Sequence, residues 1–177
     1  MLTLSLPGVS VTYYGEEIGM LDNLDISYSQ NADPAGCLCG PLFYLNPGCS
    51  RDPQRTPYQW DKFTNAGFTA PLVEPWLPIN ANYQEINLDS QKSDPSSPYT
   101  IFKNMINYRK TQPTFINGTT EITVIGNFLV VSREFEGEII ITVINFGERD
   151  YVNVLGIFPN MLEGTLLLAS DAYYPPG

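Results

Sequence analysis

The sequence predicts a chain of two unlike parts, a loop-rich α/β segment over residues 1–113 and an antiparallel β domain over residues 114–177. Short runs of β-forming residues, separated by turn signals, crowd into the second part. Proline and glycine interrupt most of the first part, which ends in a single helical pattern. With 43% hydrophobic and 12% aromatic residues, the 177-residue chain has enough apolar material for a packed core.

The net charge and the residue types that are absent argue against several classes of function. The net charge is −10, which argues against a nucleic-acid partner because nucleic acids bind basic surfaces. The sequence has no histidine, so histidine-based triads, general bases and metal ligands are excluded in this chain. No run of 18 apolar residues occurs, so we expect no membrane span in this segment. The sequence indicates no cofactor.

The first expected element is a buried strand. Residues 1–11 are mostly apolar, residues 9–14 are rich in β-formers, and Gly15 ends the pattern. Glu16 and Glu17 follow at once, and a carboxylate pair at a strand end suits glycoside hydrolysis. Adjacent residues point apart, however. We therefore favour a structural interpretation, in which one carboxylate faces outward and the other caps a loop.

Residues 21–50 are expected to form a long loop, which in a compact domain usually indicates function or a lid. It contains the cysteines Cys37, Cys39 and Cys49. A zinc site would need a fourth ligand, so we expect no metal and favour a short disulfide, such as Cys39 to Cys49, with one cysteine left over. A disulfide implies an oxidising compartment, and the sequon at Asn117 would fit glycosylation during secretion.

A polar loop over residues 50–61, with the sequence SRDPQRTPYQWD, is the most informative stretch. Its two prolines oppose a regular helix or a central strand, because proline fixes φ and lacks a backbone donor. The loop should be rigid and should present guanidinium groups, carboxylates and aromatic rings, which suits a sugar. Beyond it, residues 65–83 are rich in turns and aromatic residues. Trp60, Trp76 and Tyr83 could face a sugar, but we favour their packing the loop onto the body of the protein.

Regular structure returns near residue 97. Ser97-Pro98 should open a helix that runs to about Lys110 and is stopped before Pro113. After it, β-type runs occupy residues 121–126, 128–133, 139–144 and 166–168. The third run is apolar on both faces, which suggests a sheet buried on two sides.

Five motifs, in this order, resemble the α-glucosidases of the α-amylase superfamily as insect maltases carry them. They are LPGVSVTYYGEEIGM (residues 6–20), DPAGC (33–37), SRDPQRTPYQWD (50–61), NAGF (65–68) and WLPIN (76–80). The residues from 120 onward match only the general pattern of the family's C-terminal β domain. The resemblance implies that residues 1–113 form the C-terminal end of a (β/α)8 TIM barrel with a long active-site loop, followed by the antiparallel β domain.

The family chemistry implied is retaining hydrolysis of terminal α-1,4-linked glucose by a nucleophilic carboxylate, an acid carboxyl and a third, stabilising carboxylate. In the family all three precede the LPG strand, the last of them in an Asn-His-Asp motif, which a chain without histidine does not carry. We therefore expect no catalytic residue in this segment. We expect it to be the C-terminal part of a longer enzyme, to stop before the last β strand, and not to hydrolyse maltose alone.

The resemblance also implies substrate-binding residues. It places Arg51 on hydroxyls of the bound glucose, where a guanidinium fork suits vicinal hydroxyls. Arg55 is the second candidate, with an ion pair to Asp52 or Asp61 as its alternative role.

The expected partners are maltose, short α-glucosides and the missing N-terminal part of the barrel. The expected location is extracellular or in the secretory pathway, with anchoring through another part of the protein. The alternative functions are a non-enzymatic barrel, such as the heavy subunit of a heteromeric amino-acid transporter, or a cell-surface receptor.

Overall fold

The computed structural model describes residues 2–41, 48–148, 152–158 and 163–170 of the chain. The chain divides into two compact units. The first, here the loop unit, is residues 13–100, and the second, the sheet unit, combines residues 1–12 with 101–177. The sequence predicted a boundary at residue 113 between the end of a barrel and a β domain. That boundary refers to domains of the complete protein, so it stays a prediction.

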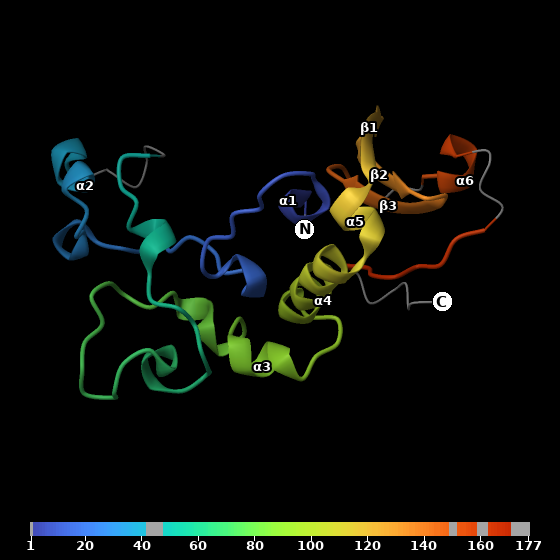
Figure 1. Ribbon diagram of the computed structural model, residues 1–177. Coiled ribbons are helices and arrows are strands. Elements are labelled where there is room, and N and C mark those ends of the chain that lie inside the picture. The colour runs from blue at the N-terminus through green and yellow to red at the C-terminus, as the bar shows by residue number, and fades with distance from the viewer. Residues whose placement is uncertain (1, 42–47, 149–151, 159–162, 171–177) are drawn as a thin grey trace. The chain divides into compact units, whose positions relative to one another are not determined.

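The sheet unit is built on three antiparallel strands in the order β1-β2-β3 (Figure 1). They are β1 (Thr119–Ile125), β2 (Phe128–Phe135) and β3 (Glu138–Asn145), so three of the predicted strands are confirmed. The β2–β3 hairpin turns through Glu136 and Gly137, whose φ angles of 52° and 87° are both left-handed. Such a two-residue turn matches the twist of the flanking strands and fixes their register.

The central strand is the buried one. Val130 and Val131 of β2 are each 1% exposed, whereas most of β3 is half-buried. The prediction of a sheet buried on two sides is therefore wrong for the described residues. β2 has a paired strand on each side, but β3 has one only on its β2 side within the described sheet, so its apolar residues stay partly open to water.

Helices complete the sheet unit. The predicted helix is confirmed as α4 (Pro98–Thr111), and the Ser97 hydroxyl accepts from the Thr100 amide at 3.2 Å. α5 (Pro113–Asn117) lies beside β2 and β3, while α1 (Leu2–Ser5) and α6 (Val154–Ile157) are single turns. Leu4, Met105 and Phe115 form the core of this unit.

Two predicted strands are wrong. Residues 9–14 form no strand, and Val9 is 95% exposed. A β-strand needs a neighbour for its backbone hydrogen bonds, and no described strand pairs with this stretch. Residues 166–168 are likewise irregular. Leu168 there packs on the core around Leu4 instead of extending the sheet.

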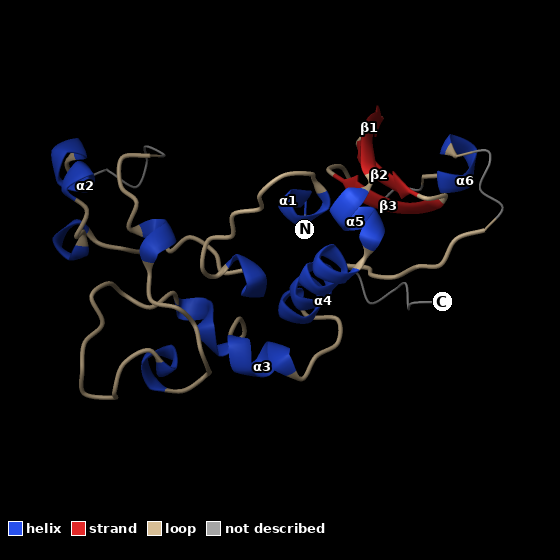
Figure 2. Ribbon diagram, viewed as in Figure 1, coloured by secondary structure: helices blue, strands red, loops and turns tan. Residues whose placement is uncertain are grey.

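The loop unit contains no strand among its described residues, as the absence of red in that part of Figure 2 shows. It consists of short helical turns joined by loops. They are η1 (Glu16–Ile18), η2 (Tyr28–Gln30), α2 (Pro34–Cys39), η4 (Pro53–Arg55), η5 (Thr64–Gly67), η6 (Ala81–Gln84) and α3 (Leu88–Lys92).

The expected long loop over residues 21–50 is thus interrupted by a helix. Asp33 accepts from the Ala35 amide at 3.1 Å and Pro34 is the first helical residue, which is a favourable start for α2. Two small apolar clusters hold the unit. One contains Ile18, Tyr58 and Leu88, and the other contains Ile26 and Leu77.

Candidate functional site

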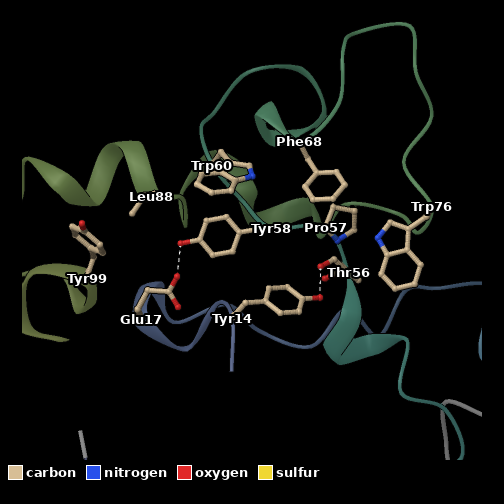
Figure 3. A pocket seen from close by; sticks show the side chains of 10 residues that line it. All are labelled: Tyr14, Glu17, Thr56, Pro57, Tyr58, Trp60, Phe68, Trp76, Leu88 and Tyr99. Atoms are coloured by element: carbon tan, nitrogen blue, oxygen red, sulfur yellow. Dashed lines mark hydrogen bonds between the residues drawn. The ribbon is translucent and has the colours of Figure 1, made fainter. Parts of the chain in front are cut away.

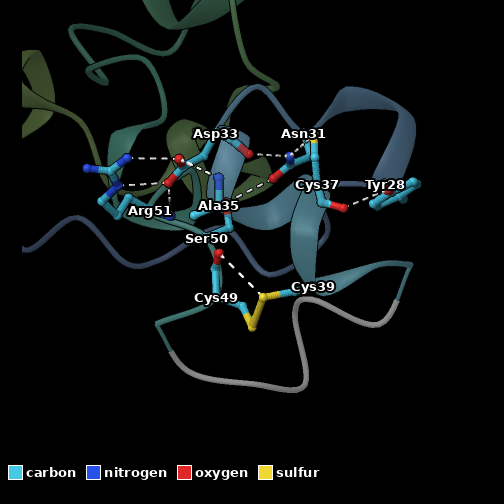
Figure 4. Close-up of a disulfide and its surroundings, with 9 residues drawn as sticks. All are labelled: Tyr28, Asn31, Asp33, Ala35, Cys37, Cys39, Cys49, Ser50 and Arg51. Carbon is cyan, nitrogen blue, oxygen red and sulfur yellow. Dashed lines mark hydrogen bonds and ion pairs between the residues drawn. A yellow bond between two sulfur atoms is a disulfide. The ribbon is translucent and has the colours of Figure 1, made fainter.

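Arg51 is held by Asp33 through a two-pronged ion pair. The Arg51 Nε donates to Asp33 Oδ2 at 2.8 Å and its Nη2 donates to Oδ1 at 2.9 Å, while the Arg51 backbone amide also reaches Oδ2 at 2.8 Å. The Asp33 side chain is 1% exposed, whereas that of Arg51 is 59% exposed. One edge of the guanidinium is therefore fixed to the protein, and its outer nitrogen points away from Asp33 (Figure 4).

A second buried carboxylate completes a reciprocal clamp between residues 31–33 and 50–52. Asp52 Oδ2 accepts from the backbone amides of Ala32 and Asp33 at 2.7 and 2.9 Å. Each segment thus supplies a carboxylate to the backbone of the other. Because buried carboxylates and amides are costly unless paired, these bonds fix the two segments against each other.

The disulfide adds a covalent link next to this clamp, between the end of α2 and the residue just before Ser50. Cys39, the last residue of α2, is bonded to Cys49, and Cys37 is a free, exposed cysteine (Figure 4). The predicted short disulfide is confirmed, and it joins the two cysteines that we named as an example. One cysteine is left over, as expected. Asp33 at one end of α2 and Cys39 at the other are both attached to the stretch that contains Arg51.

Electrostatics keep the ion pair charged. Hydrogen bonds from Arg51 hold the pKa of Asp33 well below its usual range, and Asp33 in turn raises the pKa of Arg51. Arg55 forms no ion pair with any carboxylate of the described residues, so its alternative role, an ion pair with Asp52 or Asp61, is not found there.

An aromatic pocket of about 560 Å³ lies within the loop unit (Figure 3). Most of its lining is aromatic or apolar. The lining residues are Tyr14, Glu17, Thr56, Pro57, Tyr58, Trp60, Phe68, Trp76, Leu88 and Tyr99. Both tryptophans of the chain are among them, each about half exposed, and the Trp60 ring packs on that of Tyr58 with centroids 4.6 Å apart. Their expected role in packing the loop onto the body stays a prediction.

Two tyrosine hydroxyls are fixed in the pocket wall. Tyr58 donates to Glu17 Oε1 at 2.6 Å, and Tyr14 donates to the Thr56 carbonyl at 3.0 Å. Burial raises the pKa of Tyr14 to about 12, and the nearby charge of Arg55 opposes that rise. Burial also raises the pKa of Tyr58, with the Glu17 hydrogen bond adding to it. Both hydroxyls therefore stay neutral donors at ordinary pH.

The acidic pair behaves as the structural interpretation expected. Glu16 is exposed, and Glu17 Oε2 accepts from the Gly15 amide at 2.9 Å, which caps a left-handed turn. Sequence reasoning missed the involvement of Glu17 and Tyr58 in the pocket, and of Asp33 at Arg51. The Asp33-Pro34 start signal could have located α2. No local signal could have paired Asp33 with Arg51, 18 positions away, or Glu17 with Tyr58, 41 positions away.

The described residues contain no cluster of three or more cysteine or acidic side chains arranged to hold a metal ion. Within the same part of the chain, no helix is long and apolar enough to cross a membrane. Asn117 is exposed at the end of α5.

Comparison with known proteins identifies the family. The model of the α-amylase catalytic domain matches residues 1–118. The chain belongs to this family. Among curated relatives, maltase 1 of Drosophila virilis is 38% identical over 173 residues, which cover 95% of this chain and 26% of the relative. The salivary α-glucosidase of Aedes aegypti is 42% identical over 146 residues, covering 81% and 24%.

Solved structures of the family are similar in fold. A trehalulose synthase MutB variant reaches a TM-score of 0.72 at 30% identity, covering 82% of this chain and 28% of that one. An isomaltulose synthase variant from Erwinia rhapontici, solved with sucrose, reaches 0.70 at 30% identity, covering 83% and 28%. The chain therefore spans about a quarter of the length of the family members it matches.

Proposed function

We propose that this segment forms part of an α-glucosidase that hydrolyses terminal α-1,4-linked glucose with retention of configuration. The observation that carries the proposal is the match of residues 1–118 to the α-amylase catalytic domain, joined to 37–42% identity with insect maltases and α-glucosidases. Its substrates would be maltose and short α-glucosides. The reacting carboxylates would come from barrel strands that precede this segment in such enzymes.

The segment would supply one wall of the sugar site. Arg51 has five N–H donors, of which two bind Asp33, so three remain for a ligand. A guanidinium edge of this kind suits the vicinal hydroxyls of glucose. Arg55 forms no ion pair with a carboxylate of the described residues and stays the second candidate for substrate contact. Arg51 would bind and orient the sugar without taking part in bond cleavage.

The remaining parts would play structural roles. Residues 9–14, irregular and exposed here, would become the last barrel strand when paired with strands of the N-terminal part of the barrel. Residues 114–177 would belong to the antiparallel C-terminal domain. The disulfide and the salivary relatives favour a secreted protein, which would be glycosylated at Asn117.

Maltose hydrolysis by the full-length protein tests the proposal. We expect activity in the complete protein and none in the 177-residue chain by itself; turnover by the isolated chain would overturn this division of labour. In the complete protein Arg51→Ala should lower kcat/KM by about 10- to 100-fold, the effect of removing a charged hydrogen-bond donor. An unchanged kcat/KM would remove Arg51 from the site.

A second function, that of a transporter heavy chain, has weaker support. The amino acid transporter heavy chain SLC3A1 of Mus musculus is 32% identical over 165 residues, below the insect maltases. A non-enzymatic homologue has no need to position a sugar-binding arginine. The clamped, outward-facing Arg51 therefore favours the enzyme, and a full-length protein without hydrolytic activity would favour the heavy chain or a receptor.

A further inference from the structure

We propose that Asp33 is a positioning residue for the reaction, which binds the inner edge of Arg51 so that the outer edge faces the substrate hydroxyls. This inference rests on the proposed function, because it takes Arg51 to be a sugar ligand. Asp33 itself would not touch the substrate. Its carboxylate lies buried behind the guanidinium and is fully engaged with the protein.

The geometry makes Arg51 unusual for an exposed arginine. An exposed arginine normally samples many rotamers, and fixing such a side chain on binding costs entropy. Here the Nε and Nη2 bonds to Asp33 define both the direction and the plane of the guanidinium. That entropy is lost during folding, so a ligand meets an edge of donors already in place.

Asp33 can position Arg51 only because Asp33 is itself immobile. Its Oδ1 also accepts from the Ala35 amide at 3.1 Å, and its own amide donates to Asp52 Oδ2 at 2.9 Å. The Cys39–Cys49 bridge ties the far end of α2 to the stretch just before Arg51. The contacts of Asp33 are thus set by the fold and do not depend on a ligand, which is the property a positioning residue requires.

Two substitutions separate positioning from folding. Asp33→Asn keeps an oxygen that can cap α2 but loses the charge that holds Arg51, whereas Asp33→Ala loses both. Asp94→Asn is the control for loss of a hydrogen-bonded carboxylate at an exposed position, because Asp94 also accepts local hydrogen bonds, from Ser96, and contacts no arginine. The assay is maltose hydrolysis by the full-length enzyme, with kcat and KM determined separately for each variant.

We expect Asp33→Asn to raise KM by about tenfold with a smaller change in kcat, and Asp94→Asn to match the parent protein. In an Arg51→Ala background, Asp33→Asn should have no further effect, because the residue it positions is gone. A merely structural Asp33 would lower activity equally in both backgrounds, and that result would overturn the inference.

The same variants distinguish a failure of the positioning role of Asp33 from a failure of the proposed function. If Arg51→Ala lowers kcat/KM but Asp33→Asn changes nothing, positioning by Asp33 is wrong and the proposed function stands. If the full-length protein does not hydrolyse maltose at all, the proposed function itself fails. If Asp33→Asn weakens activity without change in the cooperativity of unfolding, a folding defect is excluded as its cause.

Discussion

The interactions that stabilise the loop unit internally differ from those that stabilise the sheet unit. In the sheet unit, backbone ladders join three strands, and apolar residues such as Val130 and Phe115 fill the core. The described part of the loop unit has no ladder. Scattered backbone hydrogen bonds, such as that from the Leu88 amide to the Gln59 carbonyl at 3.0 Å, join its loops, and single buried side chains add further bonds to the backbone. Gln59, with no exposed surface, donates to the Ile86 carbonyl at 2.6 Å, and Gln91 donates to the Ile18 carbonyl at 2.8 Å.

The difference is clearest in two arginines. Arg51 is exposed, yet one edge of it is fully paired with a carboxylate. Arg133 on β2 is 5% exposed, yet its Nε and Nη1 have no hydrogen-bond partner in the described structure, and it packs over the Phe115 ring at 5.7 Å. Burial lowers the pKa of Arg133. Polar contacts therefore define the loop unit, whereas the sheet unit can carry a poorly paired cation because packing holds it.

The largest effect that would test this comparison is expected for Asp52→Ala. Asp52 is 2% exposed and accepts from the backbone amides of Ala32 and Asp33, and the Asp33 amide would then be buried without a partner. We expect a loss of about 3 kcal/mol in the free energy of unfolding. Urea denaturation measures it, and faster hydrogen exchange at the amides of Ala32 and Asp33 would localise it. Asp25→Ala, at an exposed acid, is the control. Equal effects of the two substitutions would contradict the account.

The next test addresses the sheet unit. Val130→Ala removes two methyl groups from the centre of β2, where the residue is 1% exposed, and should cost about 2 kcal/mol. Val124→Ala on β1, where the valine is 71% exposed, should cost almost nothing. Thermal unfolding compares the two variants. A similar loss for both would mean that strand propensity, and not burial, stabilises this sheet.

The elements predicted correctly from the sequence are those with local signals. The helix opened by Ser97-Pro98 and the β-type runs at residues 128–133 and 139–144 each carry their signal within a few residues, and all appear in the structure. Residues 9–14 and 166–168 show strand-like composition but form no strand. A β-rich composition indicates a preference for extended backbone. A strand also needs a second strand to pair with, and local composition does not show whether one is present.

The candidate site was predictable only in part, for the same reason. The motif at residues 50–61 named Arg51 as a candidate, because resemblance within one stretch is enough for that, and its role in binding stays a prediction. The partner Asp33 lies 18 positions away, and Glu17 lies 41 positions from Tyr58. Such pairs are set by how loops cross in space, and no periodicity or local motif encodes that crossing.

A substitution with a smaller expected loss of stability tests how much a single side-chain hydrogen bond contributes to the loop unit. Tyr58→Phe removes the hydroxyl that donates to Glu17 while keeping the 8%-exposed ring, and should cost about 1 kcal/mol. Tyr83→Phe is the matched control, because the Tyr83 hydroxyl bonds to no described residue. Chemical denaturation compares them. If the two substitutions are equally harmless, the Glu17 bond contributes nothing and the pocket is held by ring packing alone.

The smallest expected effect is a loss of stability at high pH. A tyrosine ordinarily ionises near pH 10, but burial raises the pKa of Tyr14 to about 12. The unfolded chain therefore releases this proton before the folded chain does, so stability is complete below about pH 10 and falls as the pH rises toward 12. Unfolding measured from about pH 9 to pH 12 should show a shallower fall in Tyr14→Phe than in the parent chain. An identical pH dependence in both would mean that the Tyr14 hydroxyl is solvated, and the pocket wall would then be more open to water than its hydrogen bond to Thr56 implies.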